Sequence, residues 1–147
     1  MRLITHHVAI SVRDLDRTTQ FYGDLGFRTS VLWESKDGSL RLAHLTSEAG
    51  IVLEAFEYST NGDSARPQFG VGNDLPTLGV KHFGFHVDNL EAVHRDLAER
   101  GYEVTQIQHG RTGIDYFFVA DPDGIWVEFV HETRNLDPDN IKHVIEQ

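Results

Sequence analysis

The stretch HVAISV at His7–Val12 recurs later in the chain as HFGFHV at His82–Val87. In both stretches the side chains alternate between two kinds, as expected of half-buried β-strands. Each stretch is followed by a residue that commonly caps a helix, Asp14 in the first case and Asn89 in the second. The match continues along the chain with a single-residue gap, so the sequence predicts an internal repeat.

Each half of the repeat has the pattern of a strand, a helix and three further strands. The halves span about 4–58 and 79–132, and a loop at 59–78 joins them. Gly26 and Gly101 close the two expected helices. The expected strands are 4–12, 27–34, 39–45 and 50–57, then 79–87, 102–109, 114–120 and 125–132, with a short terminal helix within 136–147.

Composition narrows the possible functions. The chain has 147 residues, 39% of them hydrophobic, which suits one domain with a real core. Its 13 Lys and Arg against 23 Asp and Glu give a net charge of −10, which argues against binding to nucleic acid or to an anionic membrane. The absence of cysteine excludes disulfides, Fe–S clusters and thiolate zinc sites. Without a long apolar run that would indicate a signal peptide or a membrane span, we expect a cytoplasmic protein.

The alternation places one histidine and one glutamate in each half on the strand face away from the expected helix. In the first half these are His7 and Glu54, and in the second half they are His82 and Glu128. The two glutamates lie in mid-strand beside large apolar residues, where a carboxylate requires a partner or a bound ion. Taken singly, each of the four is more commonly structural, but their equivalent placement in both halves favours a shared site.

Two imidazoles and two carboxylates suit a divalent ion such as Zn, Ni, Co, Mn or Fe(II). Such an ion polarises carbonyl oxygens and acidifies neighbouring protons. Tyr116 is a candidate polar residue within the expected site, and packing in the sheet is the alternative explanation for it. The residues expected near a substrate are Ser11, His86, Tyr116 and Trp126.

These segments, with Phe21–Phe27 and with Phe117–Gly124 leading to Glu128, resemble the vicinal oxygen chelate superfamily. That group contains glyoxalases, bleomycin-resistance proteins and extradiol dioxygenases, and the resemblance covers about 3–132. It implies an α+β fold in which two βαβββ modules form a cup-shaped open barrel around a metal site. We expect a homodimer, and the resemblance leaves open whether the modules pair within one chain or between two. The metal ligands that it implies are His7, Glu54, His82 and Glu128.

The ligand pattern His-Glu-His-Glu is similar to that of glyoxalase I. The resemblance therefore implies a metal-dependent lyase or isomerase that moves a proton alpha to a carbonyl, on a small substrate with two adjacent oxygens. Glu54 or Glu128 would carry the proton. Ser11 stands where bacterial glyoxalase I proteins commonly have an arginine for glutathione, so a glutathione substrate is not implied.

Two alternatives remain open on the sequence alone. An Fe(II) extradiol dioxygenase would use His7, His82 and Glu128 as ligands, although Phe118 stands where such enzymes tend to have tyrosine. A non-catalytic protein that binds a small aromatic compound or an antibiotic is the second alternative, and members of that kind generally lack the ligand set.

Overall fold

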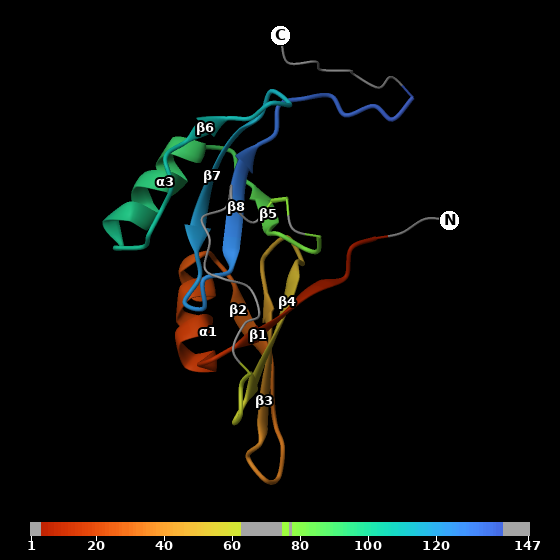
Figure 1. The fold of residues 1–147 in the computed structure, drawn as a ribbon, viewed down its shortest axis with the longest axis vertical. Coiled ribbons are helices and arrows are strands. Elements are labelled where there is room, and N and C mark those ends of the chain that lie inside the picture. The colour runs from red at the N-terminus through yellow and green to blue at the C-terminus, as the bar shows by residue number, and fades with distance from the viewer. Residues whose placement is uncertain (1–3, 63–74, 77, 140–147) are drawn as a thin grey trace. The chain divides into compact units, whose positions relative to one another are not determined.

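The computed structural model describes residues 4–62, 75–76 and 78–139. The chain divides into two compact units, Met1–Pro67 and Gln68–Gln147. Each unit contains a strand, a helix and three further strands in that order, as the internal repeat predicts (Figure 1). The α+β class with two βαβββ modules is therefore confirmed.

The first unit is a four-stranded sheet with one helix. Its elements are β1 (His7–Val12), α1 (Leu15–Asp24), β2 (Arg28–Glu34), β3 (Leu40–Thr46) and β4 (Val52–Tyr58). The strand order is β1-β4-β3-β2, in which β1 runs parallel to β4 and the other neighbours are antiparallel. Because β1 and β4 pair directly, the first and last strands of the module lie side by side.

Helix α1 forms where the sequence predicts it. The Asp14 side chain accepts hydrogen bonds from the backbone N–H groups of Asp16 and Arg17, which satisfies donors at the helix N-terminus. At the other end Gly26 has a φ of 90°, and the Phe27 N–H reaches back into the last turn. One stripe of the helix is buried, consisting of Leu15, Thr18, Phe21 and Tyr22.

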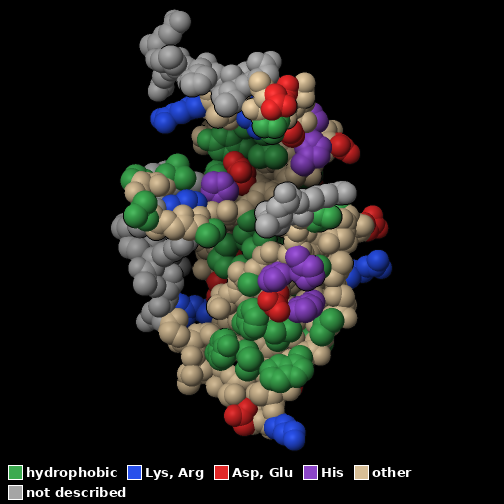
Figure 2. All heavy atoms as spheres, turned by 90° about the vertical axis from the view of Figure 1, so that its right-hand side faces the viewer, with side chains coloured by type: hydrophobic (Ala, Val, Ile, Leu, Met, Phe, Trp, Pro, Cys, Tyr) green, Lys and Arg blue, Asp and Glu red, His purple; other side chains and the backbone are tan. Residues whose placement is uncertain are grey.

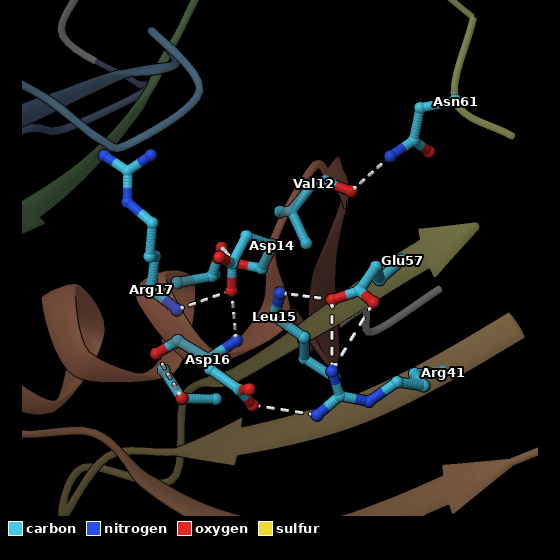
Figure 3. Close-up of polar contacts among 10 residues, drawn as sticks. Val12, Asp14, Leu15, Asp16, Arg17, Arg41, Glu57 and Asn61 are labelled. Carbon is cyan, nitrogen blue, oxygen red and sulfur yellow. Dashed lines mark hydrogen bonds and ion pairs between the residues drawn. The ribbon is translucent and has the colours of Figure 1, made fainter. Parts of the chain in front are cut away.

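A polar network ties the start of α1 to the sheet (Figure 3). The Glu57 carboxylate of β4 accepts hydrogen bonds from the Leu15 N–H and from the Arg41 guanidinium of β3. Arg41 also donates to Asp16 on the helix at 2.8 Å, and this bond raises the pKa of Arg41. The negative carboxylate at the positive end of the helix dipole is a favourable arrangement, so Glu57 is explained structurally.

The second unit repeats this architecture. Its elements are β5 (Phe83–His86), α3 (Leu90–Glu99), β6 (Gln108–His109), β7 (Asp115–Ala120) and β8 (Trp126–His131). The strand order is β5-β8-β7-β6, with β5 parallel to β8. The Asn89 side chain caps α3 by accepting from the Ala92 N–H. The rings of Phe117 and Phe129 stack at 5.2 Å in the core between sheet and helix.

The strand predicted at 102–109 is largely absent. Only the two-residue β6 and an isolated bridge between Val104 and Val119 remain. The Thr105 hydroxyl accepts the Phe118 N–H at 2.9 Å, while the Thr105 carbonyl bonds the His94 ring on α3. A side-chain hydroxyl thus takes the place of a backbone carbonyl in the ladder, which is why regular pairing stops there.

Other boundaries differ at strand starts. The strand predicted at 4–12 begins at His7, and the one predicted at 79–87 begins at Phe83, so His82 lies just before β5. Most of the predicted loop at 59–78 and of the predicted terminal helix at 136–147 lies outside the described residues. In the part of the chain that the structure describes, no helix is long and apolar enough to cross a membrane.

Candidate functional site

In the first unit, the sheet face that carries the expected ligands is the one opposite the buried core. The register pairs Glu54 of β4 with Ala9 of β1 on one side and with His44 of β3 on the other. His7 lies two residues before Ala9 and therefore shares that face. The neighbouring residues with opposite orientation, such as Leu53, are buried in the core.

Glu54 lies between two histidines. Its Oε2 is 3.7 Å from the His7 Nε2, which is longer than a hydrogen bond, and its Oε1 is 3.0 Å from the His44 Nε2. The side chains of Glu54, His44 and His7 are 23%, 34% and 45% exposed, so the carboxylate is the most buried of the three. The His6 ring contacts the His7 ring, with 2.8 Å between their Nδ1 atoms. Figure 2 shows histidine side chains gathered beside an acidic side chain and bordered by hydrophobic ones.

The second unit holds the corresponding pair. The His82 Nε2 lies 3.3 Å from the Glu128 Oε2, with both side chains largely buried. The His82 Nδ1 is buried without a hydrogen-bond partner among the described atoms, and the ring packs edge-on against Phe118 at 5.0 Å. Phe118 and Glu128 thus both contact this imidazole.

A glycine makes room for Glu128. Gly84 of β5 pairs with Glu128 of β8, and a Cβ at Gly84 would lie only 3.2 Å from the Glu128 Oε2. The corresponding residue in the first unit is Ala9, opposite Glu54. The carboxylate of Glu128 therefore lies directly over the backbone of its neighbouring strand.

The residues expected near a substrate lie on the same faces. Tyr116 and His86 both pair with Val130, two residues beyond Glu128, and the Trp126 ring lies 6.2 Å from that of Phe118. The Nδ1 of His86 accepts the Glu132 N–H at 3.0 Å, so one nitrogen of that ring is already engaged. Ser11 pairs with Phe56 on the His7 face of the first unit. Their role in binding a substrate stays a prediction.

The structure brings the expected ligands together as two pairs, His7 with Glu54 and His82 with Glu128. Within 4–62, 75–76 and 78–139, it holds no group of three or more His, Asp or Glu side chains placed to hold a metal ion. His44 is the residue that sequence reasoning missed. Counting back from the turn before β4 would have found it, because the hairpin that pairs Thr46 with Val52 must also pair His44 with Glu54.

The donors fit a borderline divalent ion chemically. Two donors that share one tetrahedral ion at about 2.1 Å lie roughly 3.4 Å apart. The two His–Glu separations, 3.7 Å and 3.3 Å, are close to that spacing. Each pair thus supplies one nitrogen and one oxygen donor for such an ion.

Comparison with known proteins identifies the family. The family model of the Glyoxalase/Bleomycin resistance protein/Dioxygenase superfamily matches residues 4–129. The chain belongs to this superfamily. It is 31% identical over 129 residues to a lactoylglutathione lyase of Haemophilus influenzae, covering 84% of this chain and 89% of that one. A solved glyoxalase family protein from Enterococcus faecalis matches with a TM-score of 0.73 and 29% identity, over 87% of this chain and 97% of that one.

A second lactoylglutathione lyase, longer than this chain, is also similar in sequence. The chain is 24% identical over 153 aligned positions to a lactoylglutathione lyase of Schizosaccharomyces pombe, covering 94% of this chain. The chain spans about half the length of that relative, 50%. The two His–Glu pairs thus belong to a protein of the glyoxalase superfamily that has lactoylglutathione lyases among its relatives.

Proposed function

We propose that this protein is a metal-dependent lyase or isomerase that transfers a proton alpha to a carbonyl group. The proposed ligands of a single divalent ion are His7, Glu54, His82 and Glu128. The observation that carries the proposal is the equivalent His–Glu pair in each unit, with each glutamate mid-strand and largely buried. The lactoylglutathione lyase relatives support the same reaction type.

The proposed chemistry divides between ion and protein. A bound divalent ion would polarise a substrate carbonyl and make the adjacent C–H more acidic. His7 and His82 would serve as neutral nitrogen ligands. Glu54 or Glu128 would accept the proton from carbon and return it to the neighbouring carbon.

The proposed substrate is a small molecule with two adjacent oxygens. The relatives' names give lactoylglutathione as theirs. In this chain Ser11 offers a hydroxyl on the His7 face and no cation for a glutathione carboxylate. We therefore place glutathione conjugates among several α-hydroxycarbonyl candidates, and we propose no nucleic-acid or membrane partner.

Metal binding is the first test. After incubation with Zn²⁺, Ni²⁺, Co²⁺ or Mn²⁺ and dialysis, we expect about one ion per wild-type chain. His7→Ala and His82→Ala should each bind the ion at least tenfold more weakly. His109→Ala, at an exposed histidine on β6, is the matched control and should bind like the wild type. Equal metal content in the wild type and His7→Ala would contradict the proposal.

Proton transfer is the second test. In D₂O, a wild-type enzyme that works as proposed incorporates deuterium at the carbon next to the carbonyl of a turned-over substrate, which NMR detects. We expect Glu54→Gln or Glu128→Gln to abolish this exchange while retaining part of the metal. Exchange that persists in both variants would exclude the two glutamates as the base. Oxygen uptake with catechols under Fe²⁺ would instead indicate a dioxygenase.

A further inference from the structure

The two proposed carboxylate ligands have different neighbours. In each unit the glutamate pairs across the sheet with one residue of the adjacent antiparallel strand, and these partners are His44 for Glu54 and Phe118 for Glu128. His44 bonds Glu54 at 3.0 Å, whereas Phe118 is 6% exposed and carries no hydrogen-bonding group. The repeat is therefore broken at the residue that contacts the carboxylate.

The two carboxylate oxygens of Glu54 face different histidines. Oε1 accepts from the His44 Nε2, and Oε2 lies on the side of the His7 Nε2. An ionised carboxylate only accepts hydrogen bonds, so the His44 N–H is the donor. With its Nε2 engaged in this way, His44 is placed to orient Glu54 and not to act as a ligand.

We propose that His44 is a positioning residue that holds Glu54 through Oε1 and leaves Oε2, on the His7 side, for a divalent cation. This inference rests on the proposed function. Groups that hydrogen-bond a metal-binding carboxylate fix its orientation, and their loss typically weakens metal binding by about 10–100-fold. The Phe118 side chain offers Glu128 no such bond.

The test compares Co²⁺ binding in variants of the full chain. Co²⁺ is the probe because its visible absorption reports the ligand geometry. We expect His44→Phe, which copies the Phe118 position, to bind Co²⁺ about 10–100-fold more weakly and with a changed spectrum. His44→Gln keeps an N–H donor and should restore most of the affinity. His109→Phe removes an exposed histidine paired with Asp115 at 2.7 Å, and it should match the wild type.

The outcomes separate the two proposals. If His44→Phe binds Co²⁺ as the wild type does, or if His44→Gln is as weak as His44→Phe, the positioning role is wrong while the metal site stands. If the wild type itself binds neither Co²⁺ nor Zn²⁺, the proposed function fails, and the positioning role fails with it. Circular dichroism and thermal unfolding of each variant show whether it is folded, and His44→Ala, which also lacks a donor, takes the place of His44→Phe if that variant does not fold.

Discussion

Gly84 is the residue on which the placement of Glu128 depends most directly. A Cβ there would lie 3.2 Å from the Oε2, 3.4 Å from the Cβ and 3.5 Å from the carbonyl oxygen of Glu128. These contacts are tight enough that the carboxylate would have to move by a few tenths of an ångström. The absence of a β-carbon at position 84 thus leaves space for a charged group.

Gly84→Ala should therefore weaken Zn²⁺ binding by about tenfold, because it displaces a proposed ligand. Competition with a chromogenic chelator measures this. Gly23→Ala is the matched control, since a Cβ at Gly23 on α1 meets nothing within 4 Å. That control should leave Zn²⁺ binding unchanged and raise the free energy of unfolding by about 0.5–1 kcal/mol. Unchanged Zn²⁺ affinity in Gly84→Ala would show that Glu128 is not constrained by this contact.

At the residue scale, strand alternation was enough to single out His7, Glu54, His82 and Glu128, since it only requires counting in twos. The structure brings them together as two pairs, and their role as ligands stays a prediction. The contact of His44 with Glu54 was not predicted, because it depends on the register of the β3–β4 hairpin. Only the pairing across β3 and β4 shows that it faces Glu54.

Among the elements, the irregular pairing of the 102–109 segment with β7 can be tested at Thr105. Thr105→Val keeps the shape of the side chain but removes the hydroxyl that accepts the Phe118 N–H. A partly buried N–H without a partner costs roughly 1–2 kcal/mol, so the free energy of unfolding in urea should fall by about that amount. Thr105→Ser retains the hydroxyl and should lose less. No loss of stability in Thr105→Val would show that the hydroxyl does not support this pairing.

The turn between β2 and β3 gives a pH-dependent prediction. Hydrogen bonds from the Ser35 hydroxyl, then from the Ser39 hydroxyl and N–H, lower the pKa of Asp37 from 3.8 to about 2. Because the pKa is lower in the folded state, the stabilisation from this turn is present above pH 4 and is lost as the pH falls from about 4 to about 2. Carbon-detected NMR titration should find the low pKa in the wild type. In Ser35→Ala it should move upward, and an unmoved value would contradict the assignment.

The helices were the most predictable elements because their signals are local. Asp14 and Asn89 cap them as expected, and each helix ends next to a glycine. The strand at 102–109 was not predictable in the same way. Whether it joins the ladder is decided by Thr105 and its contacts with His94 and Phe118, which come from elsewhere in the chain.

For the whole molecule, the homodimer expected from the sequence can be tested by mixing two variants. If each metal site takes one His–Glu pair from each of two chains, a dimer of one His7→Ala chain and one His82→Ala chain regains one intact site of two. An equal mixture, refolded together, should recover about a quarter of the wild-type Zn²⁺ sites, since half of the dimers are mixed. Each variant refolded alone should show almost none. No recovery in the mixture would place both pairs in the same chain.

The internal repeat also has a consequence for how the two modules can change in sequence during evolution. A protein that arose by duplication of one βαβββ module would begin with two identical halves of a site. Here the halves differ by single replacements around otherwise equivalent carboxylates, with Ala9 and His44 on one side against Gly84 and Phe118 on the other. Residues around one carboxylate can change while all four proposed donors are retained. New substrates are then reachable by small steps in one module, without rebuilding the whole centre.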